Sequence, residues 1–158
     1  MKKKILVSAC LLGRNCRYNG GNSNLSELED AGVEWIPVCP EEAGELGTPR
    51  PAAEMQMDAA SILSGNGHVQ TIHGKDVTDK FIKGARLSLQ AGQAEGVKTA
   101  ILKSRSPSCG IENIYDGSFT GTLIKGSGIF AQLCSTSGVR CISSESVEEI
   151  KNTISKQK

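Results

Sequence analysis

Three of the six cysteines in this chain follow short apolar runs, a placement typical of ligands that share one inorganic centre. Cys10 follows the run ILVSA, Cys39 follows VEWIPV, and Cys109 is the sixth residue after TAILK. If these runs are parallel strands, their carboxyl ends meet at one edge of a sheet, where open α/β folds build their sites. Three thiolates at one point would hold a metal ion or an iron–sulfur cluster with one coordination position left open.

The residues that follow these three cysteines favour irregular backbone, because each cysteine precedes a glycine or a proline within three positions. Backbone amides in such loops are free to donate hydrogen bonds to sulfur. We expect these donors, together with any bound iron, to favour the thiolate form. Shared ligation is therefore the favoured interpretation, and separate burial of the three thiols is the alternative.

The other three cysteines have different surroundings. Cys134 lies in a helical segment and Cys141 in a strand run, so we expect both to pack as small apolar groups of the core. Cys16 follows Cys10 after five intervening residues, a spacing that matches no standard zinc or ferredoxin motif. It could be a fourth ligand, a redox partner or a neighbour of the centre, and we favour a cysteine that is not a ligand.

Zinc is the main rival metal. Structural zinc sites usually take their ligands from pairs of cysteines two to four residues apart, and this chain contains no such pair. The two histidines, His68 and His73, are far in the sequence from every cysteine. The sequence therefore favours an iron–sulfur centre over zinc.

Polar residues flank two of the candidate ligands. Glu41 and Glu42 come directly after Cys39 and Pro40, and the stretch KSRSPSC ends at Cys109. A polar loop that follows a buried strand at a sheet edge is more typical of a pocket wall than of a core. Beside a cluster, Glu41 is the better candidate for an acid–base group.

Composition excludes several classes of function. Lys and Arg total 18 against 17 Asp and Glu, so no excess positive charge indicates a nucleic-acid or membrane surface. The apolar run after Met1 is too short for a signal peptide, and no stretch approaches the length of a membrane span. We expect a cytoplasmic protein, in which cysteines are thiols or ligands rather than disulfides.

The order of apolar runs predicts one α/β domain over residues 1–158, with a mainly parallel sheet and helices on both faces. A hairpin is also expected, with its turn at 64–67 joining runs 59–63 and 68–72. Loops are expected at 40–51 and 110–126. The strands are expected at 5–9, 33–38, 99–103 and 139–143, and the helices at 25–31, 76–95, from 129 and at 147–154.

Six motifs in order resemble a family long catalogued as a domain of unknown function, whose characterised members are thiouracil desulfidases. The resemblance runs from residue 8 to residue 121, and residues 126–133 also fit. Two departures are Asn19, where aspartate is expected, and the sequence GELG at 44–47, where the family tends to read GGLP. The motifs are SACLLG (8–13), CRYNG (16–20), PVCPE (37–41), TPRP (48–51), KSRSPSCG (103–110) and YDGSFTG (115–121).

The resemblance implies a 4Fe–4S cluster held by Cys10, Cys39 and Cys109, with one iron that has no protein ligand and binds the sulfur of a thiolated pyrimidine. Iron acts there as a Lewis acid, so the carbon bound to sulfur becomes more electrophilic. Glu41 would then deprotonate the attacking water, while Ser104 would hydrogen-bond the substrate or relay a proton. No net electron transfer is needed, and no nicotinamide or flavin is expected.

Ser8 and Ser106 are the expected substrate contacts, and iron–sulfur assembly machinery is the expected protein partner. Because Glu45 is an extra carboxylate in the departing stretch, the working glutamate could be Glu41, Glu42 or Glu45. Free base, nucleoside and tRNA-borne thiouridine all stay open as substrates, with large nucleic acids disfavoured. The competing hypotheses are another 4Fe–4S enzyme, such as a lyase or dehydratase, and a non-catalytic zinc or redox-sensing module.

Overall fold

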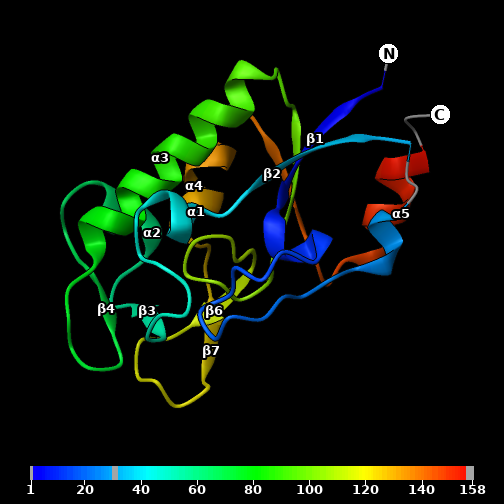
Figure 1. Cartoon of the computed structure of the whole chain (residues 1–158). Coiled ribbons are helices and arrows are strands. Elements are labelled where there is room, and N and C mark those ends of the chain that lie inside the picture. Colours follow the sequence, from blue (N-terminus) through cyan, green and yellow to red (C-terminus); the bar gives the residue numbers. More distant parts are fainter. Residues whose placement is uncertain (1, 30–31, 156–158) are drawn as a thin grey trace.

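A parallel sheet of four strands forms the centre of this computed structural model, which describes residues 2–29 and 32–155 (Figure 1). The strand order is β2–β1–β5–β8, and every neighbouring pair is parallel. The expected α/β sheet is confirmed. The strands are β1 (Lys4–Ser8), β2 (Glu34–Val38), β5 (Thr99–Leu102) and β8 (Arg140–Ser143).

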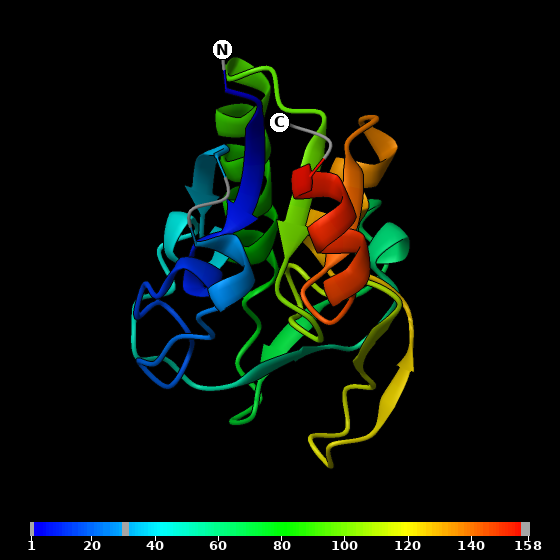
Figure 2. The ribbon, with the colours of Figure 1, turned by 90° about the vertical axis from the view of Figure 1, so that its right-hand side faces the viewer.

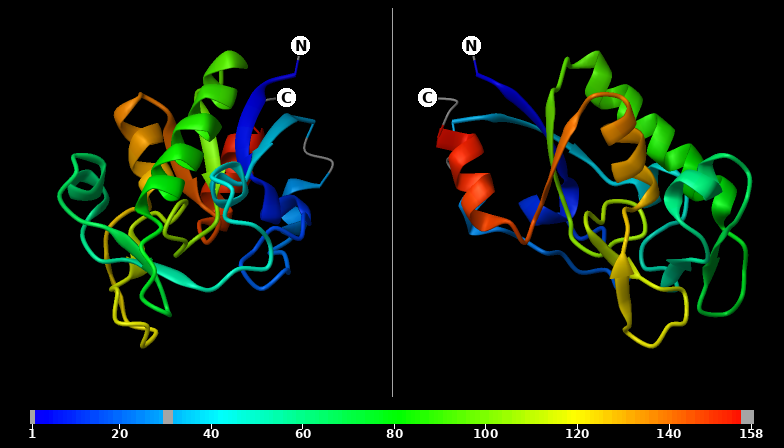
Figure 3. Two further views of the ribbon diagram at one scale, coloured as in Figure 1. Left: turned by 60° about the vertical axis from the view of Figure 1, so that its left-hand side comes forward. Right: turned by 180° about the vertical axis from the view of Figure 1, so that it is seen from behind.

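Helices cover both faces of this sheet, as expected. Side chains alternate along each strand, so the buried strands offer apolar side chains to both layers of helices. Leu6 and Ala100 face α3 (Thr78–Ala94) and α4 (Ile129–Thr136). Ile5 and Ile101 face the opposite layer, which contains α5 (Val147–Ser155) and the short 3-10 turn η2 (Ser26–Leu28). Figure 3 shows α5 on one side of the strands and the α3–α4 pair on the other.

Two small antiparallel strand pairs lie beyond the carboxyl edge of the sheet. β3 (Ala53–Met55) pairs with β4 (Val69–Thr71), and β6 (Asn113–Tyr115) pairs with β7 (Leu123–Lys125). The β6–β7 hairpin extends away from the sheet in Figure 2. Residues 110–126, expected to be a loop, therefore contain two strands.

Three other predictions about local structure were wrong. Residues 59–63 form helix α2 (Ala59–Leu63), not a hairpin strand, because Asp58 caps the helix by accepting a hydrogen bond from the Ser61 amide at 3.1 Å. The expected loop at 40–51 begins with helix α1 (Pro40–Ala43). Proline is favoured at the first position of a helix, and Pro40 occupies that position here. The expected helix at 25–31 is only the turn η2, and residues 30–31 lie outside the described residues.

Glycines bring α1 into close contact with α3. A Cβ on Gly44 would lie 2.1 Å from the Lys80 carbonyl oxygen, and one on Gly84 would lie 1.8 Å from the Pro40 carbonyl oxygen. Both obstacles are backbone atoms, so no rotamer change could relieve the clash. This contact sets the position of the short helix that follows Cys39.

In the part of the chain that the structure describes, no helix combines the length and the apolar character that a membrane span requires.

Gly84→Ala should lower the free energy of unfolding by about 1–3 kcal/mol or more, since overpacking against fixed backbone forces the two helices apart. Urea denaturation measures the effect. Gln90→Ala, at an exposed position of the same helix, is the control and should change stability by less than about 0.5 kcal/mol. Equal stability of the two variants would contradict the role of this contact.

Candidate metal centre

A cavity of about 840 Å³ opens at the carboxyl edge of the sheet. Its lining includes four of the six cysteines and all four of the other candidate site residues. Residues that are far apart in the sequence therefore meet here, as the parallel-strand argument expected. The site residues that line the cavity are Ser8, Cys10, Cys16, Cys39, Glu41, Ser104, Ser106 and Cys109.

Each candidate ligand follows a strand on a differently folded loop. Cys10 lies in the 3-10 turn η1 (Ala9–Leu12), which Gly13 ends in the left-handed conformation. Cys39 comes directly after β2 and is the N-cap residue of α1. Cys109 lies in a turn held by the Ser106 hydroxyl oxygen, which accepts hydrogen bonds from the amides of Ser108 and Cys109, both at 3.0 Å.

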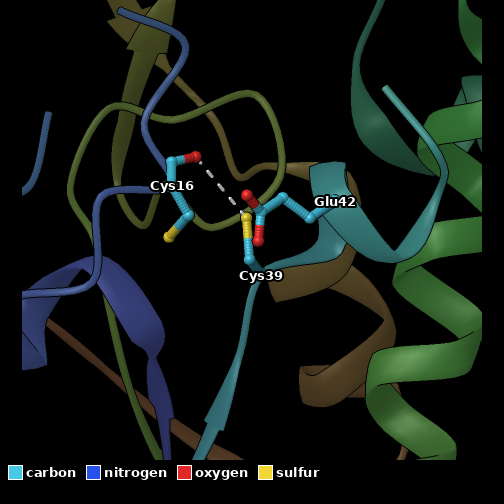
Figure 4. Close-up of side chains that lie close together, drawn as sticks. All are labelled: Cys16, Cys39 and Glu42. Carbon is cyan, nitrogen blue, oxygen red and sulfur yellow. Dashed lines mark hydrogen bonds between the residues drawn. The ribbon is translucent and has the colours of Figure 1, made fainter. Parts of the chain in front are cut away.

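Cys16 is also at this centre. Its side chain is buried, and its carbonyl oxygen accepts a hydrogen bond from the Cys39 thiol, with 3.7 Å between oxygen and sulfur (Figure 4). The glycine-containing loop after η1 thus folds Cys16 back towards the other thiols. The structure agrees with the sequence analysis that Cys16 is near the centre, and it adds that its sulfur approaches that of Cys39.

Three of the four thiols that line the cavity, those of Cys16, Cys39 and Cys109, have raised pKa values. A hydrogen bond with Cys10 raises the pKa of Cys16 to about 11. A hydrogen bond with Cys16 and then burial raise the pKa of Cys39, and burial raises the pKa of Cys109 well above its usual range. A hydrogen bond with the Glu42 backbone lowers the pKa of Cys39, in the direction that the sequence analysis expected, but the hydrogen bond with Cys16 and burial outweigh it. These sulfurs need a bound cation to become thiolates.

Of the three glutamates in this region, Glu41 lines the cavity. Arg50 donates a hydrogen bond to Glu41 Oε2 at 3.2 Å, and both side chains are nearly buried. Glu41 Oε1 is buried and has no hydrogen-bond partner among the described residues. One carboxylate oxygen is thus held by a cation while the other can still accept a proton.

The other two glutamates are placed differently. Glu42 accepts a hydrogen bond from the Thr48 hydroxyl at 2.6 Å, and its other oxygen lies 2.8 Å from the Arg14 guanidinium. Glu45 pairs with Lys83 at 2.8 Å, and 73 % of its side chain is exposed. The geometry therefore favours Glu41 as the carboxylate that faces a bound substrate.

The serines in the cavity wall have distinct partners. Ser8 Oγ accepts a hydrogen bond from the Lys103 amide at 2.9 Å, which ties β1 to the end of β5. The Lys103 ammonium donates to Ser104 Oγ at 3.2 Å, so the Ser104 hydroxyl proton can point into the cavity. Because Ser8 and Ser106 accept hydrogen bonds from backbone amides, both also hold the loops that carry the cysteines.

Sequence reasoning missed Arg50, the buried partner of Glu41. The same guanidinium donates to the Cys16 carbonyl oxygen at 3.0 Å, so it joins the loop after η1 to the segment after β2. Arg50 is part of the TPRP motif, and this motif was the feature of the sequence that could have identified Arg50 as a site residue. Lys103, half-buried, also faces the cavity, and burial together with the Arg17 charge lowers its pKa.

Residues 5–146 match the family model for 2-thiouracil desulfurase. The chain belongs to the 2-thiouracil desulfurase family. The family is the one that the sequence motifs resembled, and that prediction is confirmed. The matched region includes all three loops that carry the candidate ligands.

Two relatives extend this comparison. The chain is 38 % identical over 149 residues to an uncharacterised protein of Bacillus subtilis (strain 168), YbbK, covering 92 % of this chain and 99 % of that protein. It also matches the solved structure of a [4Fe-4S]-dependent thiouracil desulfidase, TudS, with a TM-score of 0.86 and 39 % identity. That match covers 98 % of this chain and 99 % of the TudS chain, so the whole fold is shared.

Arg50→Gln should lower the free energy of unfolding by about 3–5 kcal/mol, because it leaves the nearly buried Glu41 carboxylate without its cation. Urea denaturation measures the loss. The matched control is Arg140→Gln, which removes an exposed ion pair with Glu149 and should cost about 1 kcal/mol or less. Similar costs for the two variants would show that the Arg50–Glu41 pair has no special weight.

Proposed function

We propose that this protein is a 4Fe–4S-dependent desulfidase that converts thiouracil or a thiolated uridine to the corresponding uracil and sulfide without net electron transfer. The observation that carries the proposal is the meeting of Cys10, Cys39 and Cys109 at one cavity, beside Glu41, in a chain of the 2-thiouracil desulfurase family. The likeness to TudS over nearly the whole chain supports the same cofactor here.

The donor set fits this cluster. Cys10, Cys39 and Cys109 come from three loops that line one cavity, so their sulfurs can reach different irons of one cluster. A hydrogen bond with Cys16 and burial raise the pKa of Cys39, and burial raises the pKa of Cys109, so both thiolates would need a bound cation such as iron. Three protein ligands leave the fourth iron free. Such an iron supplies a Lewis-acidic position with affinity for the substrate sulfur when the cluster is bound.

The chain's own residues would perform the proton transfers. Glu41 Oε1, buried and without a hydrogen-bond partner in the described residues, accepts a proton from the attacking water. Arg50 donates a hydrogen bond to the other oxygen of the Glu41 carboxylate and balances its negative charge. Ser104, whose oxygen is held by Lys103, would hydrogen-bond the pyrimidine or relay a proton of the attacking water to it.

The overall reaction balances without a redox partner. Water adds to the carbon that bears sulfur, the carbon–sulfur bond breaks, and the carbonyl group replaces the thiocarbonyl group. The two protons of water leave with the sulfur as hydrogen sulfide or its anion. No oxidant or reductant takes part, so the proposed reaction needs only water as a second reactant.

We also propose that the single domain works in the cytoplasm and receives its cluster from iron–sulfur assembly machinery. All six cysteines are free thiols, as expected in a reducing compartment. A reducing environment would keep the candidate ligands available for iron.

The test uses full-length protein reconstituted with iron and sulfide under nitrogen. The protein should become brown with broad visible absorbance, and 2-thiouracil should yield uracil and sulfide in equal amounts without added reductant. A cluster-loaded protein that releases no sulfide would point to another iron–sulfur reaction. Colourless protein with stoichiometric zinc would point to the non-catalytic module.

Cys→Ser variants test the ligand set. Substitution of Cys10, Cys39 or Cys109 should each abolish cluster loading, measured as bound iron and visible absorbance, since a neutral hydroxyl is a poor iron ligand. Cys141→Ser is the control, because Cys141 does not line the cavity, and it should bind iron like the wild type. Full iron content in any of the first three variants would remove that residue from the ligand set.

Glu41→Gln should reduce kcat by about 10²–10⁴-fold at unchanged iron content, because an amide cannot accept the proton of water. Steady-state kinetics with 2-thiouracil measures the loss. Glu45→Gln removes a carboxylate at the surface and should leave kcat unchanged. If Glu45→Gln loses activity and Glu41→Gln does not, the working glutamate has been misassigned.

A further inference from the structure

Cys16, Cys39 and Glu42 form a compact group at the edge of the cavity (Figure 4). Their two sulfurs and a carboxylate oxygen all lie within 4.8 Å of one another. The three residues come from the loop after η1, the residue after β2 and the helix α1. Cys16 is only 2 % exposed, whereas Cys39 and Glu42 are half-buried, so the group offers three possible anionic donors with partial access to solvent.

The carboxylate of this group is held in place but not saturated. Glu42 Oε2 accepts the Thr48 hydroxyl at 2.6 Å. Glu42 Oε1 is buried and accepts no well-aligned hydrogen bond from the described residues, although the Arg14 guanidinium lies 2.8 Å away. A buried carboxylate oxygen with free acceptor capacity beside two thiols is an arrangement suited to bind a thiophilic metal ion.

The distances suit one ion rather than a cluster. Zinc binds sulfur at about 2.3 Å and carboxylate oxygen at about 2.0–2.2 Å, so donors within 4.8 Å of one another need to move by about 1 Å at most. Ligands of a 4Fe–4S cluster bind different irons and must lie farther apart. Neither Cys10 nor Cys109 belongs to the compact group.

We infer that Cys16, Cys39 and Glu42 form a second metal site, which binds one thiophilic divalent cation, zinc above all. Two thiolates and a carboxylate are typical zinc ligands, and solvent in the cavity supplies the fourth. The three anionic donors exceed the charge of one zinc ion by a single unit, which the Arg14 guanidinium balances.

Cys39 cannot serve both centres at once. Zinc and the cluster exclude each other if Cys39 is a ligand of the cluster. This exclusion rests on the proposed function. Zinc in the metal-free protein would therefore block cluster assembly, and a loaded cluster would keep zinc out. In this arrangement Cys16 binds metal without being a ligand of the catalytic cluster.

The test begins with metal-free full-length protein titrated with Zn²⁺ alone under nitrogen, with Co²⁺ as the spectroscopic probe. One equivalent of Co²⁺ should bind and give the near-ultraviolet charge-transfer absorption of cobalt–thiolate bonds. Cys16→Ser and Glu42→Gln should each weaken zinc binding by at least about 10–100-fold, which is the effect of losing a supporting group at a metal site. Cys141→Ser, a thiol outside the cavity, should bind zinc like the wild type.

Competition tests the exclusion. One equivalent of Zn²⁺ added before reconstitution should prevent iron uptake by the wild type, whereas Cys16→Ser should still load its cluster. Zinc binding that Cys16→Ser and Glu42→Gln leave unchanged, or no zinc binding at all, would overturn the second site. Loss of the cluster in Cys16→Ser would make Cys16 a cluster ligand and overturn it as well.

These readouts are independent of catalysis. Zinc affinity is measured on protein without iron, so an absence of desulfidase activity in the reconstituted wild type would refute the proposed function and leave the zinc result standing. Zinc that binds cluster-loaded protein without loss of iron would overturn the exclusion.

Discussion

Parallel strand pairing is the constraint on which the site depends. Ser8 pairs with Val38 across β1 and β2, and Val7 pairs with Ile101 of β5. These three strands consequently end at one edge, and the chain leaves each of them towards the same side. Cysteines separated by up to 99 positions in the sequence can therefore line a single cavity, without any one segment having to carry a complete ligand set.

Burial at this edge then determines the chemistry. The thiols of Cys16, Cys39 and Cys109 have raised pKa values because of hydrogen bonds with other thiols and burial, and a bound cation can reverse this preference. Glu41 is in a different situation, since Arg50 balances its charge and leaves one oxygen free. A site with protonated thiols and a paired carboxylate is thus suited to bind a metal centre and to activate water beside it.

Cys39 belongs to both of the proposed ligand sets. It directly follows β2, is the N-cap residue of α1 and lines the cavity, and its sulfur lies within 4.8 Å of a Glu42 carboxylate oxygen. The close glycine contact between α1 and α3 holds the start of that helix, and Arg50 ties the Cys16 loop to the same place. On these proposals, the choice between a cluster and a single ion would depend on which of two neighbouring loops supplies the other ligands of the Cys39 sulfur.

Much of this protein could be predicted from the residues alone. Short apolar runs followed by glycine, proline and cysteine identified the parallel sheet and the candidate ligands, because strand periodicity and loop-forming residues are local signals. The motifs around Cys10, Cys39 and Cys109 identified the family. Local signals failed for residues 59–63, where a cap at Asp58 outweighed an apolar run that resembled a strand.

Only the tertiary structure decided which polar groups meet. The pairing of Arg50 with Glu41, the exposure of Glu45 and the approach of Cys16 to Cys39 depend on how distant loops pack together. The pKa shifts of the thiols have the same origin, since burial and neighbouring groups are properties of the fold. Sequence determines which side chains are available, but desolvation and contacts across the sheet edge determine their charge.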